Sequence, residues 1–268
     1  MSRNIIVVVA VLAIVALAAL ALSLFRTPEE ASAPITAATL VIETSQPVAA
    51  ATQPPAAATT APTATVATEP TVAPTSAPEA TGAAEPAPAA APRIFELVQA
   101  ESQARFIIDE VLRGSPERVV GVTDQVAAQI AIDPANPGAA QLGSVTVNAR
   151  TVATDNDMRN RAIKNFILNT NNYEFVTFQP TELVGLPATV TVGQPFTFQI
   201  MGDLTIRDVT QSVTFEATVT PASETRIEGL ATTTFPYRDF GLSIPDSPSV
   251  DTVADDVTLE LEFVAVAQ

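Results

Sequence analysis

Two residue types that could carry much of protein chemistry are missing from this chain. Its 268 residues include no histidine and no cysteine. Nucleophilic sites of the Ser-His-Asp or Cys-His kind, zinc sites with nitrogen and sulfur ligands, and haem held by histidine are therefore excluded. The glycine-rich phosphate loops GxxxxGK[ST] and GxGxxG and the calcium-loop spacing are also missing from the sequence. We predict neither a cofactor nor a metal site.

Carboxylates are the remaining candidates for acid–base chemistry. Adjacent pairs such as Asp109-Glu110 and Asp255-Asp256 could supply an acid and a base. With 29 acidic residues in the chain, such neighbours are expected by chance. We therefore predict that the protein is not an enzyme, and a carboxylate-based hydrolase of wall polymers is kept as a third hypothesis. The formal net charge of −16 argues against binding to nucleic acid and against electrostatic docking on anionic lipid headgroups.

Two groups of basic side chains allow alternative interpretations. Arg159, Arg161 and Lys164 form either a solvated face that balances nearby acids or a site for an anionic headgroup. Arg238, in the aromatic stretch FPYRDFG, forms either a ring-stacked pair with Asp239 that stabilises a loop or a contact to a ligand.

Strands must position most of these side chains. In MGDLTIRDVTQSVTFEATV, residues 201–219, apolar side chains alternate on both sides of a polar break at Arg207-Asp208, which predicts a hairpin with one apolar face. Similar alternation predicts strands in 104–112, 119–121, 125–133, 141–149, 173–178, 196–206, 211–220, 226–235 and 257–266. One-sided alternation excludes a parallel sheet covered on both faces. We predict a mainly β fold, an antiparallel barrel of about eight strands, because closure removes exposed sheet edges.

One helix is expected, over residues 154–169. Asp155, Asn156 or Asp157 can cap its first turn. An apolar stripe follows at helical spacing, and we expect it to lie on the barrel. Its members are Met158, Ala162, Ile163, Phe166 and Ile167.

The N-terminal third of the chain has a different composition. Residues 5–25 are apolar except for Ser23, and roughly 20 such residues are enough for a membrane-spanning helix. The alternative is a cleaved signal peptide, whose apolar region is shorter. We predict an uncleaved anchor in residues 1–26, so that the protein crosses the cell membrane once and its C-terminal domain is extracytoplasmic, an orientation only slightly favoured by Arg3 and Arg26.

Residues 27–93, rich in Ala, Pro and Thr, are predicted to be a disordered linker. Such a stalk would span roughly 45 Å as a coil and roughly 200 Å when extended. It is either an unmodified spacer or an O-glycosylated one. The folded domain is predicted to occupy residues 94–268.

Several motifs occur in one order across this domain. They are ESQARFIIDE (101–110), VVGVTDQVAAQIAID (119–133), SVTVNARTVATDNDMRNRAI (144–163), YEFVTF (173–178), GDLTIRDVTQSV (202–213) and YRDFG (237–241). Together they resemble the YceI-like family of lipocalin-fold, polyisoprenoid-binding domains. The sequence departs from the family pattern at Glu101 and Glu110, where the family has histidines, and at Asp208, where it has glycine.

This resemblance implies a lipocalin-like barrel that holds an isoprenoid or similar apolar lipid. The two glutamates make an anionic diphosphate headgroup a doubtful guest. The expected lining residues, each of which is alternatively plain core, are Phe106, Ile108, Val126, Ile130, Val145, Phe196, Phe198, Leu204, Phe215 and Phe263. Small residues such as Ala104, Ala128 and Ala217 would leave room inside. A structural or adhesive domain without a ligand is the alternative function, and the oligomeric state is not determined by the sequence.

Overall fold

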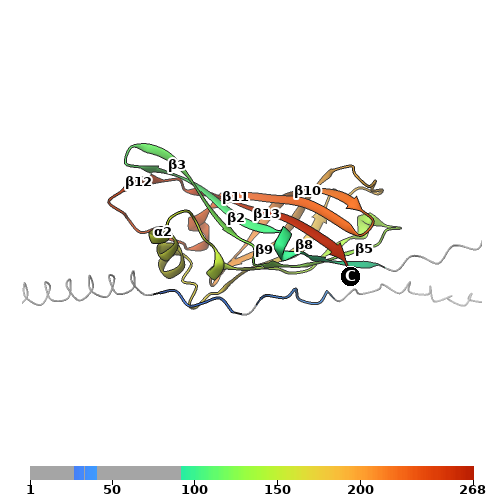
Figure 1. Cartoon of the computed structure of the whole chain (residues 1–268). Helices are drawn as coiled ribbons and strands as arrows, with labels where there is room; N and C mark the ends of the chain where they lie inside the picture. Colours follow the sequence, from blue (N-terminus) through green and yellow to red (C-terminus); the bar gives the residue numbers. More distant parts are fainter. Residues whose placement is uncertain (1–26, 33, 41–91) are drawn as a thin grey trace, which may run out of the picture. The chain divides into compact units, whose positions relative to one another are not determined.

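The computed structural model describes residues 27–32, 34–40 and 92–268. One antiparallel sheet of thirteen strands dominates it, with short helical segments between strands (Figure 1). The strands are β1 (Arg93–Leu97), β2 (Gln103–Leu112), β3 (Ser115–Thr123), β4 (Val126–Ala127), β5 (Gln129–Ile132), β6 (Gln141–Leu142), β7 (Val145–Asn148), β8 (Phe175–Val184), β9 (Phe196–Ile206), β10 (Val209–Ser223), β11 (Arg226–Pro236), β12 (Val250–Val253) and β13 (Asp256–Ala267). The helical segments are η1 (Gln99–Glu101), η2 (Pro137–Ala139), η3 (Ala149–Thr151), α2 (Asp157–Ala162), η4 (Ile163–Ile167) and η5 (Tyr237–Phe240).

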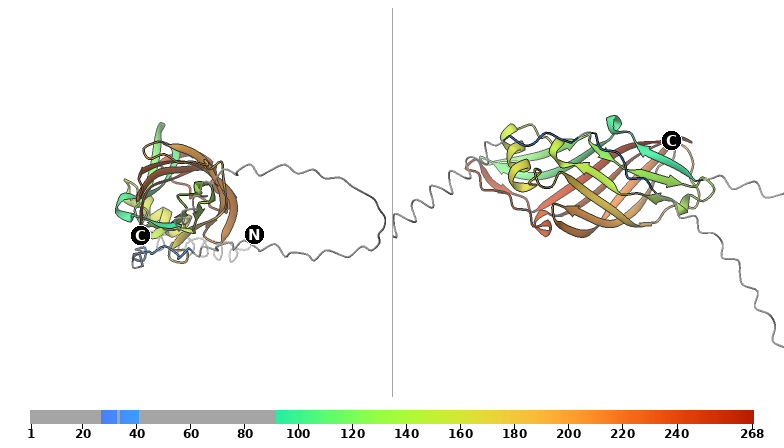
Figure 2. Two further views of the ribbon diagram at one scale, coloured as in Figure 1. Left: turned by 90° about the vertical axis from the view of Figure 1, so that its right-hand side faces the viewer. Right: turned by 90° about the horizontal axis from the view of Figure 1, so that it is seen from below.

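The sheet curls back on itself. Its main order is β4-β7-β8-β9-β10-β11-β13-β1-β5-β6, and β2 joins β13 to β3 and β12. Only Ala128 separates β4, which pairs with β7, from β5, which pairs with β1. The two ends of the order therefore meet in one stretch of chain, and the end-on view in Figure 2 shows the strands encircling a common axis. The prediction of a mainly β, antiparallel fold with a short helix is confirmed, while the number of strands was underestimated because short strands interrupt this stretch.

The hairpin of β9 and β10 turns where the sequence predicts. Ile206 pairs with Val209, so that Arg207 and Asp208 form the turn, and the register continues to Phe196 opposite Val219. Arg207 adopts a φ of 59°, as tight two-residue hairpins require of at least one turn residue. Inward side chains of both strands, among them Leu204 and Phe215, belong to the buried core. The apolar face of this hairpin thus faces the interior of the curled sheet.

The helix is shorter than predicted and changes its pitch. Asn156 caps α2 by accepting hydrogen bonds from the amides of Met158 and Arg159, at 2.9 and 3.0 Å. After six residues the chain passes into the π-helical turn η4. Met158 is 57% exposed, so its place in the predicted apolar stripe was wrong: it lies in the first turn and projects to solvent, whereas Ile163 is buried. Figure 1 shows α2 at one end of the long axis and β5 toward the other.

Residues 27–32 and 34–40, which we call the N-terminal strap, contain no helix or strand but contact the domain. The amide and hydroxyl of Ser32 donate to the two carboxylate oxygens of Glu174, at 2.7 and 2.6 Å. Further along, the amide of Leu40 donates to Gln129 at 2.9 Å. The strap is the blue segment along the outside of the sheet in Figures 1 and 2. The remaining part of the predicted linker up to residue 91 lies outside the described residues.

Within the part of the chain that the structure describes, no helix has the length and apolar character needed to cross a membrane. The anchor predicted over residues 1–26 lies outside that part.

Candidate functional site

The interior of the curled sheet contains two adjoining cavities. The first has a volume of about 270 Å³ and the second of about 440 Å³. Five residues line both cavities and mark the junction between them: Leu142, Val145, Ile200, Ala231 and Leu261. Ligand pockets in proteins have volumes of roughly 300–1,000 Å³, so the two cavities together are large enough for a small lipid.

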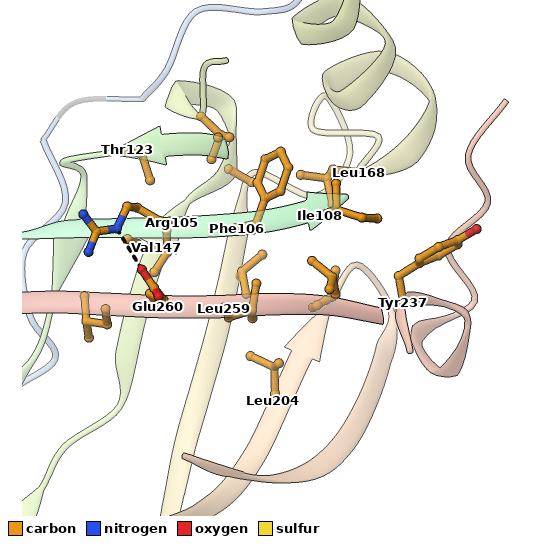
Figure 3. A pocket seen from close by; sticks show the side chains of 18 of the residues that line it. Arg105, Phe106, Ile108, Thr123, Val147, Leu168, Leu204, Tyr237, Leu259 and Glu260 are labelled. Atoms are coloured by element: carbon orange, nitrogen blue, oxygen red, sulfur yellow. Dashed lines mark hydrogen bonds and ion pairs between the residues drawn. The ribbon is translucent and has the colours of Figure 1, made fainter. Parts of the chain in front are cut away.

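Alternate residues of β2 and β13 build one side of the first cavity. Phe106 and Ile108 of β2 and Leu259 of β13 line it, as expected for strands with a period of two (Figure 3). Leu261, two positions after Leu259, lines it as well. Val147 of β7 and Leu168, which follows η4, also line this cavity. Its wall is almost entirely apolar, which suits an apolar guest.

One charged group faces the first cavity from the interior side of β2. Glu110 is buried, with its side chain 8% exposed, and pairs with Arg159 of α2 at 2.8 Å. Arg105 and Glu260, which pair at 3.1 Å, alternate with Phe106 and Leu259 along their strands and belong to the other face of the sheet (Figure 3). The carboxylate at the cavity is therefore already compensated by a guanidinium.

The second cavity lies at the β5 end of the domain and is lined by phenylalanine. Phe196 and Phe198 of β9 stack with their ring centroids 5.8 Å apart, and Phe263 of β13 lines the same cavity. Part of the wall is the loop between β8 and β9, which contributes Val190 and Val192. Val192 is 53% exposed, so the apolar lining continues to the protein surface.

Metal-binding clusters were sought over the described ranges. No three acidic residues within residues 27–32, 34–40 and 92–268 converge closely enough to hold a metal ion. The chemistry that these cavities support is the burial of apolar surface, which contributes about 0.8 kcal/mol for each CH₂ group.

A comparison with protein families matches residues 95–265 to the YceI-like domain. The chain belongs to the YceI-like family. Among solved structures, a polyisoprenoid-binding domain from Saccharophagus degradans implicated in plant cell wall breakdown is similar, with 16% identity and a TM-score of 0.53 over 65% of this chain and 98% of that one. Burkholderia cenocepacia BcnA is similar with 19% identity and a TM-score of 0.51, over 63% of this chain and 99% of that one. A comparison with curated proteins gives no match.

These structural likenesses show the YceI-like fold. The predicted family resemblance is therefore confirmed, and the motifs that carried it can be placed in the structure.

Nine of the ten predicted lining residues line a cavity of this YceI-like domain. Phe106, Ile108, Leu204 and Phe215 line the first cavity, Ile130, Phe196, Phe198 and Phe263 line the second, and Val145 lines both. Val126 is fully buried but is not part of either wall. It belongs to β4, and Val126, Ala127 and Ala128 are buried in succession, so the expected alternation from Val126 to Ile132 fails at the break between β4 and β5. That a lipid contacts the nine residues stays a prediction.

The two glutamates at the histidine positions of the YceI-like pattern have different surroundings. Glu110 lines the first cavity, whereas Glu101 lies on the surface and pairs with Arg226 at 2.6 Å. The hydrogen bond from Arg226 holds the pKa of Glu101 below its ordinary value. Only one of these two positions therefore faces a cavity in this member of the family.

The structure shows the ion partners of two arginines whose roles the sequence left open. Arg159 pairs with Asp155 and Glu110, which agrees with the interpretation of a face that balances nearby acids. Arg238 stacks on Tyr237, 5.0 Å from the ring centroid, as predicted, but its ion partner is Asp255 at 3.1 Å. The prediction of Asp239 was wrong because η5 turns the chain, whereas Asp255 lies next to the start of β13.

Several cavity residues were missed although the sequence carried a signal for some of them. Ile200 has the same strand parity as Phe196 and Phe198. Leu259 and Leu261 alternate with Phe263, which correctly predicts an inward direction, but they were left out of the expected lining set. The loop residues Val190 and Val192 follow no such alternation, so only the structure places them at the second cavity.

Proposed function

We propose that this protein binds an apolar, isoprenoid-type lipid inside its sheet while attached to the cell membrane on the extracytoplasmic side. The observation that carries the proposal is the pair of adjoining apolar cavities inside a YceI-like domain. The similar domain from Saccharophagus degradans, described as polyisoprenoid-binding, supports the choice of lipid.

The cavity walls favour a guest with an uncharged polar end. The first cavity presents Glu110 already paired with Arg159. A diphosphate placed there would have to compete with Glu110 for the guanidinium of Arg159, and its own desolvation would add to the cost. An isoprenoid alcohol or quinone avoids this competition and still gains the apolar burial.

Membrane attachment is supported by the apolar residues 5–25 of the sequence. Protease treatment of intact cells tests this part of the proposal, because an extracytoplasmic domain is digested while a cytoplasmic control protein is not. Protection of the domain in intact cells, with digestion after lysis, contradicts the proposed location.

Photocrosslinking tests the lipid-binding part. The full chain, in nanodiscs of a defined phospholipid, is incubated with a long-chain isoprenoid alcohol that carries a diazirine near its far end, and labelled peptides are mapped by mass spectrometry. We expect labels in β2, β9 and β13, whose residues line the cavities, and competition by unlabelled isoprenoid alcohol. Labelling confined to residues 1–26, or unaffected by competitor, would support the structural or adhesive alternative.

A further inference from the structure

The N-terminal strap contacts the two ends of the domain in a fixed direction. Its first residues contact the end that carries α2: Glu29 pairs with Arg150 at 3.1 Å, and its amide donates to Asn171 at 3.2 Å. Ile35, in the middle of the strap, accepts from the side chain of Gln99 at 2.7 Å, and the last residue, Leu40, contacts Gln129 of β5. The strap therefore runs from the helical end of the domain toward the end with β5 (Figure 2).

The contact at the helical end is a partly buried ionic network. Arg150 and Glu174, each with a side chain 12% exposed, pair at 3.2 Å, and Glu174 also accepts from Asn148 at 3.0 Å. The strap adds Ser32, which donates twice to Glu174. Burial alone would raise the pKa of Glu174, but the hydrogen bonds from Ser32 and Asn148 and the charge of Arg150 bring it below its ordinary value. Because Arg150 and Glu174 are largely shielded from water, salt screens this pair less than it screens an ion pair on the surface.

The contact at the other end depends on a glycine. A Cβ atom at position 143 would lie 2.9 Å from Cδ1 of Leu40, so Gly143 gives the Leu40 side chain its space. The amide of Leu40 donates to the side chain of Gln129 in β5. The strap is thus held at both ends, by polar groups and by one apolar side chain.

Chain length then limits how far the helical end can lie from a membrane. The apolar residues 5–25 end four positions before Glu29. Four residues span at most about 14 Å even when fully extended. A linker that was free over residues 27–93 would instead allow a separation of roughly 45–200 Å between the membrane and the domain. With the strap docked, residues 41–91 connect Leu40 to the start of the domain and add nothing to this distance.

We infer that the strap holds the domain with its α2 end against the lipid bilayer, so that the first cavity opens toward the membrane. The inference rests on the proposed membrane attachment and names the partner surface. At this end the α2–η4 segment carries the exposed Met158, together with Arg161, Lys164 and one acid, Asp157, so the segment is weakly basic although the whole chain is acidic. Arg159 and Ile167 of the same segment line the first cavity, so a lipid has a short path between bilayer and interior.

Energy transfer from two positions tests this orientation. The chain has no cysteine, so Met158→Cys and Val192→Cys each provide one labelling site, at the α2 end and at the second cavity respectively. The full chain is reconstituted in phosphatidylcholine–phosphatidylglycerol vesicles with a headgroup-labelled acceptor lipid, and outward-facing domains are labelled with an impermeant donor dye. We expect stronger transfer from position 158 than from position 192. Equal transfer, stronger transfer from position 192, or failure of the chain to enter vesicles overturns the inference.

Two charge variants test whether the strap causes the orientation. Ser32→Asp places a carboxylate against Glu174 and should remove the difference between the two positions, and Glu29→Lys, opposite Arg150, should do the same. Ser45→Asp adds the same charge outside the strap and should preserve the difference. A difference that persists in both strap variants overturns the role of the strap. Photocrosslinking of the same samples reports lipid binding separately, so loss of orientation with retained binding is distinguishable from failure of the proposed function.

Discussion

Filling the junction between the two cavities tests whether one lipid occupies both. Ala231 is 5% exposed and lines both cavities, and its strand neighbour Leu230 is 38% exposed on the outer face. Ala231→Phe adds an aromatic ring at the junction, where it would separate the first cavity from the second. A chain that passes through the junction would then lose the part of its burial that the closed-off cavity provides.

The expected loss of binding free energy can be estimated from the size of the closed-off cavity and from the free energy of burying CH₂ groups. The first cavity makes up roughly two fifths of the combined space, with about 270 Å³ beside about 440 Å³. At about 0.8 kcal/mol for each buried CH₂, excluding one isoprene unit costs up to about 4 kcal/mol, which is almost a thousandfold in affinity. We expect a large loss for a long-chain isoprenoid alcohol and a small one for a short chain that fits a single cavity.

Competition against the photoreactive isoprenoid measures both affinities. Leu230→Phe is the matched control, because it makes a change to the same residue type on the same strand without entering either cavity. Denaturant unfolding establishes that Ala231→Phe is folded, since overpacking costs about 1–3 kcal/mol. An unchanged long-chain affinity in the folded variant would refute the idea that one guest spans the junction.

Three further outcomes follow from the same contacts. Gly121→Val should overlap the Phe106 ring and force it into the first cavity, so that crosslinking in β2 decreases and unfolding shows a loss of about 1–3 kcal/mol. Arg159→Gln should leave Glu110 buried without its partner and destabilise the domain by about 3 kcal/mol in denaturant titrations, a loss that a second change of Glu110 to Gln should largely reverse. The two hydrogen bonds from Ser32 of the strap help to lower the pKa of Glu174 against the effect of burial, so docking is favoured by the ionised form; energy transfer should show the strap held near neutral pH and released as the pH falls through that lowered pKa.

The direction of side chains along a strand could be predicted from the sequence where one face of the strand is buried and the other is exposed to solvent. In β9 and β13 every second side chain faces the interior, so Phe196, Phe198 and Phe263 were placed correctly from alternation alone. The same reasoning failed at Val126, because β4 and β5 pair with different neighbours and the alternation breaks between them. Alternation reports the faces of a strand, and it carries no information about where a strand is interrupted.

The strap could not be predicted because its contacts use features that composition does not reveal. Its residues show no apolar period, and the groups that hold it are single polar side chains and backbone amides, such as Ser32 on Glu174. Their partners, Arg150 and Glu174, are more than a hundred positions away in the sequence. Docking of this kind depends on a surface that exists only after the sheet has formed.

The hollow interior also has a cause that the sequence reasoning missed. Small residues such as Ala217 were expected to leave the space, yet phenylalanines also line it. Three of these rings lie over glycines of a neighbouring strand: Phe106 over Gly121, Phe178 over Gly202 and Phe263 over Gly229. A Cβ atom at any of the three glycines would overlap the ring, so each ring can lie flat against the wall only because its neighbour has no side chain. The capacity for a guest therefore depends on aromatic–glycine pairs, which keep the wall apolar while they keep the centre open.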